Sequence, residues 1–368
     1  MSHILKKGTE KEFPSKKRQW IIMKKTLVAL AVLAAAGSAQ AIELYNQDNV
    51  TVNLTGDIEV VYLKGVEDGS EFQQEIQDAD FGFDTRYAIN DDLQFGGFWE
   101  FSGSSTDTKT GNVYVGLYSN TAGSIKFGRL DSMLDDAGIG SDFQFGINSF
   151  FSNGSPFGAD ESVRYDIDKG NFYGGIAYKQ DKNGNAGLGV DGNFLDAKIG
   201  ARVADFDFTG FYGRADFKGA GADISDLPLV TGEGKETFYA VEGRWSGVEN
   251  LNLAIAYYNI KLDPASMDES LTQQTFALAA DYTINKVIIA AGVSQSDYDK
   301  ALAVSSTSTE TWDKQTNWYI NAGYILAPGA TAYVEVGAND GRTYEVDGNT
   351  FTSTKNGTGV AVGIKAEF

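Results

Sequence analysis

The chain has 368 residues, of which 42% are hydrophobic and 22% are charged, and its formal net charge is −20 at pH 7. It contains no cysteine, which excludes a disulfide framework and a thiolate metal site. The acidity disfavours nucleic acid as a partner, because phosphates require a basic surface.

The first 41 residues carry the pattern of an export signal. Met23-Lys24-Lys25 is a short basic segment, residues 26–36 form an apolar run, and Ala39-Gln40-Ala41 is an A-x-A cleavage site. This order is typical of a secretory signal peptide, and the run is too short to span a membrane. We predict an upstream extension over 1–22, a cleaved signal peptide over 23–41 and a mature domain over 42–368, with translation starting at either Met1 or Met23.

The mature domain is more acidic than the whole chain. It holds 22 basic and 48 acidic residues, a net charge of −26, and the one histidine, His3, lies before it. The lack of histidine excludes Ser-His-Asp hydrolysis and His-ligated zinc. We therefore expect no catalytic site, no metal site and no cofactor. The charge favours solvated acidic loops or a cavity that attracts cations.

Period-2 alternation of apolar and polar residues recurs along the mature domain, without a long apolar run or a sustained helical period. The segments are separated alternately by short turns and by longer polar loops, which is typical of an all-β transmembrane β-barrel. A soluble β-sandwich would also bury one face of each strand, so alternation alone leaves that class open. We count sixteen antiparallel strands, and a different register in the Gly- and Asn-rich region 181–197 would give fourteen or eighteen. The expected strands cover 50–62, 81–87, 93–101, 113–117, 125–127, 163–167, 172–178, 199–203, 206–212, 239–245, 251–257, 276–282, 287–293, 318–324, 332–336 and 360–368.

The last strand runs to the final residue of the chain. Its apolar face ends in Ile364, Ala366 and Phe368, and its other face carries Lys365 and Glu367. An apolar strand at a chain end suits a barrel that closes by pairing its last strand with its first, because closure leaves no edge. Aromatic residues recur near the strand ends, where they would form two membrane-interface girdles: Tyr62, Trp99, Tyr178, Tyr212, Trp245, Tyr257, Tyr282, Trp318 and Tyr324.

Two motifs lack the context that their chemistry needs. Residues 187–192 spell G-x-G-x-x-G, but no strand precedes them and no helix follows, as a dinucleotide site would require. Asp181, Asn183 and Asn185 have the spacing of a calcium loop, but its sixth and twelfth positions are Ala186 and Gly192. Acidic loop clusters could still hold Ca²⁺ or Mg²⁺ loosely and so bridge to the phosphates of lipopolysaccharide.

Several short motifs resemble those of the Gram-negative general porins. They are Gly116-Leu117, Gly123-Ser124, Phe127-Gly128-Arg129, Leu44-Tyr45-Asn46, the turn from Ile89 to Leu93, and the terminal aromatic Phe368. The resemblance covers the whole mature domain. It implies a sixteen-stranded barrel in the outer membrane, usually a homotrimer, through which small hydrophilic solutes diffuse. It also implies that Phe368 is the assembly signal recognised by the outer-membrane assembly machinery.

In this family the third extracellular loop folds into the lumen and narrows it, and residues 130–161 suit that role. The segment is much longer than a hairpin connection, and it carries five phenylalanines that could pin it to the wall: Phe143, Phe145, Phe150, Phe151 and Phe157. Carboxylates on such a loop would screen solutes by size and charge. The candidates are Asp131, Asp135, Asp136, Asp142, Asp160 and Glu161. The alternative is an acidic loop that faces outward.

General porins also carry a ladder of basic residues on the opposite wall, and here the match is incomplete. The candidates are Arg86, Lys126, Arg129, Arg164 and Arg244. Asp80 and Asp84 stand where further basic residues would be expected, which weakens or shifts the transverse field. With a net charge of −26, we expect a general diffusion channel that prefers cations. The alternatives are a substrate-selective channel, or a non-conducting barrel that acts as an adhesin or receptor.

Overall fold

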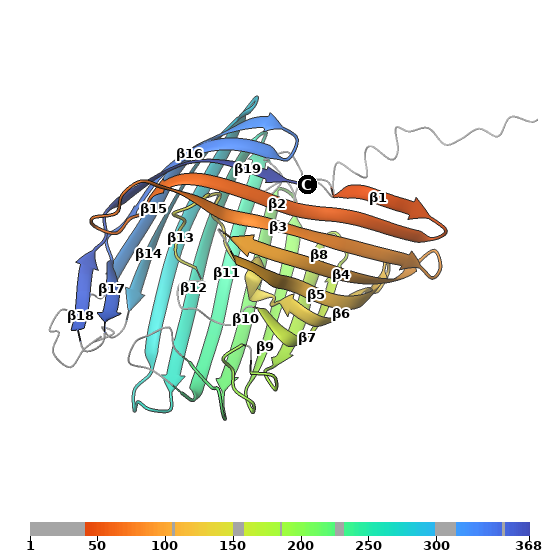
Figure 1. Ribbon diagram of the computed structural model, residues 1–368, viewed down its shortest axis with the longest axis horizontal. Helices are drawn as coiled ribbons and strands as arrows, with labels where there is room; N and C mark the ends of the chain where they lie inside the picture. Colours follow the sequence, from red (N-terminus) through yellow and green to blue (C-terminus); the bar gives the residue numbers. More distant parts are fainter. Residues whose placement is uncertain are drawn as a thin grey trace, which may run out of the picture.

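A computed structural model of the chain describes residues 41–104, 107–149, 158–184, 186–224, 232–298, 314–347 and 350–368 (Figure 1). The predicted extension and nearly all of the predicted signal peptide lie outside these residues. One short 3₁₀ helix, η1 (Leu134–Asp136), accompanies the strands. Within the described part of the chain, no helix is both long and apolar enough to cross a membrane.

Strands account for most of the described residues. Their bounds are β1 Ile42–Gln47, β2 Val50–Lys64, β3 Gln73–Ala88, β4 Leu93–Ser104, β5 Asp107–Ser119, β6 Gly123–Asp131, β7 Gly158–Asp168, β8 Phe172–Gln180, β9 Asn193–Val203, β10 Phe206–Phe217, β11 Gly234–Val248, β12 Leu251–Pro264, β13 Leu271–Ile284, β14 Val287–Tyr298, β15 Lys314–Ala327, β16 Ala330–Asn339, β17 Arg342–Asp347, β18 Thr350–Lys355 and β19 Thr358–Glu367.

Sixteen of the described strands form a closed antiparallel barrel. Strands β2 to β16 pair with their neighbours in chain order, and β19 pairs with both β16 and β2. The predicted strand count and the closure between the last strand and the first are therefore confirmed. Each of the sixteen expected segments coincides with one strand of the ring. In the region 181–197, where the sequence left the register open, β8 pairs directly with β9. The hairpin of β17 and β18 forms a sheet of its own.

The first and the last of the described strands share one edge of β2. β1 pairs with Val50–Leu54 on that edge, and β19 pairs with Asp57–Lys64 farther along it. Phe368 extends this pairing: its N–H donates to the carbonyl of Gly56 at 2.9 Å and its carbonyl accepts from the Gly56 N–H at 2.7 Å. In Figure 1 the C-terminus accordingly lies beside the start of β1.

The alternating pattern separates the outer surface from the interior. On β19, Val362 and Ile364 are 53% and 55% exposed, whereas Ala361 between β2 and β16 is fully buried. Large apolar side chains are exposed in the same way around the ring, from Ile58 on β2 to Val334 on β16. A continuous apolar exterior of this kind fits the hydrocarbon of a bilayer and not water.

The two ends of the barrel differ. One end has tight hairpins, in which Asn49, Ala204, Asn250 and Asn285 adopt positive φ angles, as two-residue turns require. The other end carries the long connections, including residues 132–157. On this loop-bearing end, residues 187–191 and 218–223 are joined by backbone hydrogen bonds. An apolar cluster beneath them lies on the inner side of β9 to β13, with Leu188, Phe194, Phe217, Ile224, Phe238, Ile260 and Leu262 among its buried members.

Candidate pore constriction

The constriction loop, residues 132–157 between β6 and β7, enters the barrel, and its described part ends at Ser149. It begins with η1, whose Leu134 is fully buried. A side chain at Gly213 on β10 would come within 2.8 Å of Leu134, so the glycine makes room for this contact. The predicted third loop folded into the lumen is therefore confirmed. Of its five phenylalanines, Phe150, Phe151 and Phe157 lie outside the described residues.

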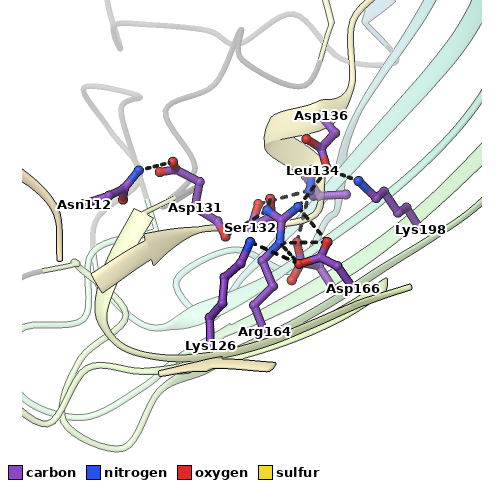
Figure 2. Close-up of polar contacts among 10 residues, drawn as sticks. Asn112, Lys126, Asp131, Ser132, Leu134, Asp136, Arg164, Asp166 and Lys198 are labelled. Atoms are coloured by element: carbon purple, nitrogen blue, oxygen red, sulfur yellow. Dashed lines mark hydrogen bonds and ion pairs between the residues drawn. The ribbon is translucent and has the colours of Figure 1, made fainter. Parts of the chain in front are cut away.

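The base of the loop is fastened by Arg164 on β7 (Figure 2). One guanidinium nitrogen donates to the carbonyl of Ser132 at 2.8 Å, and another reaches Asp136 at 3.1 Å. Asp166, two residues farther along the same face of β7, accepts from the guanidinium at 2.9 Å and lies 3.5 Å from the ammonium of Lys126. Asp136 also forms an ion pair with Lys198 of β9. The loop and three strands thus share one network of five charges.

Buried wall carboxylates hold the loop along the inner surface of the barrel. Asp196 on β9 accepts from the Leu134 N–H at 3.1 Å, and Glu242 on β11 accepts from the Gly138 N–H at 2.7 Å. Farther along, Asp281 on β13 accepts from the hydroxyl of Ser141 at 3.3 Å. Because these anchors come from successive parts of the barrel wall, the loop follows that wall and does not cut across the centre.

Glu335 on β16 holds the farthest part of the loop. Its carboxylate accepts three backbone N–H groups, from Phe143 at 2.6 Å, Gln144 at 3.0 Å and Phe145 at 2.7 Å. Hydrogen bonds to a charged, buried acceptor are stronger than neutral ones. Gln144 also donates to Glu59 on β2 at 2.8 Å. The loop therefore reaches the strands where the barrel closes.

Two phenylalanines add apolar contacts at the same place. The ring of Phe143 stacks on Tyr333 with centroids 3.9 Å apart and planes 2° from parallel. Phe145 occupies space that side chains at Gly337 and Gly359 would fill, since their Cβ atoms would lie within 2.3 Å of its ring or Cβ. The loop then turns back, and the N–H of Asn148 donates to Ser294 on β14 at 2.9 Å.

The loop leaves an open cavity of about 1120 Å³ between itself and the wall of β4 to β11. Asp135, Asp136 and Asp142 line it from the loop, and Arg244 lines it from β11. Desolvation inside the barrel raises the pKa of both Asp135 and Asp142 to about 6, and the neighbouring carboxylates Asp131 and Glu335 respectively add to the shift. These two loop carboxylates therefore keep their protons to a higher pH than ordinary aspartates do.

All of the predicted basic residues except Arg129 face the interior with carboxylate partners. Arg86 on β3 bonds to Asp84 at 2.5 Å and lies 3.4 Å above the ring of Tyr118. Arg244 contacts Glu242 at 2.8 Å and donates to the carbonyl of Gly138. With Lys126 and Arg164 on Asp166, four of the five predicted basic residues are paired inside the barrel.

Arg129, Asp160 and Glu161 do not join this group. Leu130 and Ala159, which pair across β6 and β7, are buried on the inner side, so alternation places Arg129 and Asp160 on the other side. Arg129 follows the regular alternation of β6, since Phe127 two positions earlier is exposed on the outside. The irregularity lies on β7, which has one extra residue between Ala159 and Ser162, and there Asp160 pairs with Arg129. Glu161 accepts from the backbone of Asn183 at 3.2 Å, and Asp131 accepts from Asn112 at 2.6 Å near the loop base.

The sequence alone did not identify the wall carboxylates or Lys198 as residues that contact the constriction loop. Alternation alone would have placed Lys198 inside, because its neighbour Ile199 faces outward with 72% exposure. Nothing local to Asp196, Asp281 or Glu335 could have revealed their role, because each one binds a loop between 62 and 192 residues away in the sequence.

Known proteins share this architecture. The family described as Gram-negative porin matches residues 26–344. Porin-like protein H of Photobacterium profundum is 29% identical over 326 residues, which cover 86% of this chain and 95% of that protein. Among solved structures, the trimer form of OmpT from Vibrio cholerae, an outer membrane protein, aligns with a TM-score of 0.69 at 18% identity, over 87% of this chain and all of that one.

A second solved structure, the anion-selective porin of Comamonas acidovorans, aligns with a TM-score of 0.66 at 13% identity, over 87% of this chain and all of that one. At such identities the two structural matches establish the fold alone. The family match, by contrast, extends over most of the chain, and the closed sixteen-stranded barrel with its inward loop agrees with it. The chain belongs to the family of Gram-negative porins.

Proposed function

We propose that the protein is a general diffusion channel of the outer membrane that passes small hydrophilic solutes and prefers cations. Porins of this family reside in the outer membrane, and the family and fold are those of channel proteins. The observation that carries the proposal is the pairing of inward-facing basic residues with carboxylates, which leaves carboxylates in excess. The cavity beside the constriction loop supports a conducting channel and argues against a plugged barrel.

The pairing follows from the strand period. Arg86 and Asp84, Arg164 and Asp166, and Arg244 and Glu242 each stand two residues apart on one face of one strand. A fixed counter-charge within 3 Å neutralises most of the field of an arginine at a distance. An anion that enters the lumen therefore meets paired cations instead of a free basic ladder.

A second part of the wall is acidic. Asp57 on β2 stands directly opposite Asp80 on β3, and Glu59 stands opposite Asp78. In this group the described residues provide one cation, Lys365, whose ammonium lies 2.8 Å from Glu367 and 3.9 Å from Asp57. Like charges in directly opposed positions destabilise a sheet, and a mobile cation in the lumen relieves that repulsion.

Reversal potentials in planar bilayers under a KCl gradient test the selectivity. We expect the reversal potential of the wild type to have the sign that indicates cation preference. In the double variant Asp57→Asn/Asp80→Asn we expect the reversal potential to shift clearly toward zero. The variant Asp68→Asn/Asp91→Asn is the matched control, because it removes two exposed carboxylates outside the barrel wall. Anion preference in the wild type would reject the proposal. One structural neighbour is named an anion-selective porin, so the fold is compatible with either sign.

We also propose that the protein is a homotrimer. A structural neighbour has been solved in a trimer form, and the apolar exterior provides surface that subunits could bury. Native mass spectrometry of the detergent-solubilised protein tests this, with three copies as the expected mass. A monomer that conducts in bilayers would contradict the trimer while leaving the channel function intact.

A further inference from the structure

The junction between β2 and β19 closes the ring without a connecting turn. Among the described strands, all other neighbours in the ring follow one another along the chain, apart from the β17–β18 hairpin inserted before β19. Asp57–Lys64 and Val360–Glu367 are instead joined only by the pairing of segments from opposite ends of the barrel sequence. Closing so long a loop costs chain entropy, and no turn retains the two strands once they part. We name this junction the seam.

Tyr333 on β16 reaches across the seam from the inside of the barrel. Its ring lies against Gly363 on β19, where a Cβ atom would overlap the ring, and its hydroxyl donates to Glu59 on β2. Both Tyr333 and Glu59 are buried. A hydrogen bond to a carboxylate that is shielded from water is stronger than one at the surface. One side chain therefore connects three adjacent strands of the ring.

The constriction loop covers this connection with its tip, Phe143 to Phe145. The ring of Phe143 stacks on that of Tyr333. The side-chain amide of Gln144 donates to Glu59 at 2.8 Å and to the Tyr333 hydroxyl at 3.1 Å. The tip therefore adds two hydrogen bonds to the contact between β16 and β2 and encloses it within the protein.

Phe145 fills a socket formed by glycines on two neighbouring strands. Cβ atoms at Gly337 on β16 and at Gly359 on β19 would both overlap its side chain. An aromatic side chain packed against two backbones gains contact that exists only while the two strands stand side by side. The tip therefore touches all three strands, whereas Glu335, which accepts from the backbone of the same loop segment, lies on β16 alone.

Backbone hydrogen bonds fasten the seam at its two ends. At the end with tight hairpins, Phe368 and Gly56 exchange two of them. At the loop-bearing end, the N–H of Gly357 donates to the carbonyl of Val66 at 2.7 Å. Glu59, which accepts the hydrogen bonds from the tip and from β16, stands between Gly56 and Val66 on the β2 side of the seam. The tip therefore braces the part of the seam between its two fastened ends.

We propose that the tip of the constriction loop is a latch that holds the seam shut, in addition to narrowing the pore. Its docking surface comes from β16, β19 and β2 and is complete only when these strands are paired. The seated tip favours the closed seam, and by thermodynamic reciprocity the closed seam favours the seated tip. The loop consequently takes its final place after the barrel closes, and a seam that opens releases it. The inference is independent of the ion preference of the pore.

Hydrogen exchange followed by mass spectrometry, on the purified protein in detergent micelles, tests the latch. In Gln144→Ala/Phe145→Ala we expect the amides of segments 57–64 and 360–367 to exchange roughly tenfold faster or more than in the wild type. Exchange in β10 to β12, on the opposite side of the ring, should stay unchanged. The matched control is Ser141→Ala/Asn148→Ala, which removes loop side-chain bonds to β13, β14 and β15.

The control should leave the exchange of the seam at the wild-type rate. Equal acceleration in the control overturns the proposal, and so does wild-type exchange of the seam in a folded tip variant. Heat-modifiable mobility in gels shows whether each variant is folded. If the double tip variant does not fold, Gln144→Leu replaces it, because this change removes only the two side-chain hydrogen bonds. Faster exchange confined to the seam then supports the latch, and the wild-type rate overturns it.

Discussion

At the scale of single residues, the molecule uses buried acidic groups as fasteners. Glu335 binds three consecutive backbone N–H groups of the constriction loop, and Asp196 and Glu242 bind others nearer its base. A carboxylate can accept several hydrogen bonds at once, and it needs no cation when backbone dipoles surround it. Part of the acidic excess of the chain therefore serves to position the loop that defines the pore.

Replacement of Glu335 by glutamine should loosen the loop. The amide group of glutamine would direct N–H donors toward the N–H groups of the loop, so at least one bond is replaced by repulsion. We expect the free energy of unfolding to fall by about 2 kcal/mol and the single-channel current to become noisier. Glu249→Gln, in an exposed turn, is the control. An unchanged melting temperature and a quiet current would contradict the role of Glu335 as a loop anchor.

The acidic loop residues should make selectivity depend on pH. Asp135 and Asp142 have pKa values raised by desolvation inside the barrel to about 6, so they are mostly ionised at pH 7.5 and mostly neutral at pH 5. We expect the cation preference to fall over this interval, measured as the reversal potential. Because their folded-state pKa exceeds the ordinary value of 3.8, these groups favour the folded state more as pH falls through 6 toward 4.

The double variant Asp135→Asn/Asp142→Asn isolates this contribution. Its reversal potential should change less between pH 7.5 and pH 5 than that of the wild type. Its preference for cations at pH 7.5 should also be lower. The same pH response in variant and wild type would show that other groups in the lumen are responsible.

At the scale of elements, the barrel is closed by a strand that ends with the chain. Both backbone hydrogen bonds of Phe368 go to Gly56, so the last residue completes the pairing of β19 with β2. Its side chain lies on the outer face of the strand by alternation, where it adds nothing to the lumen. The resemblance to porins gives this aromatic residue a second role as the assembly signal, and that role remains a prediction.

Two changes at Phe368 separate these roles. Phe368→Ala keeps both backbone hydrogen bonds, whereas deletion of the residue removes them. We expect both changes to lower the yield of assembled protein in the outer membrane several-fold, while only the deletion lowers the yield of refolding into detergent micelles. Wild-type outer-membrane yield of Phe368→Ala would exclude recognition of the aromatic ring.

At the scale of the whole molecule, alternation predicted much of the architecture. The strand count, the closure and the outward faces follow from period 2, because a one-residue slip would reverse every side chain in a strand. Asp160 shows the limit of this rule, since β7 has one extra residue there and the buried residues Ala159 and Ser162 lie three positions apart instead of two. The path of the constriction loop depends on contacts such as Phe143 with Tyr333, which lie 190 residues apart, and local pattern carries no information about such contacts.

The position of β1 and β19 on one edge of β2 has a consequence for connectivity. Ile42 pairs with Leu54 and Phe368 pairs with Gly56, so Ile42 and Phe368 lie about 7 Å apart along that edge. The part of the polypeptide from Ile42 to Phe368 is thus nearly cyclic. A circular permutant that joins Phe368 to Ile42 through a few Gly and Ser residues, with new ends in the 265–270 connection, should refold in micelles into the same barrel.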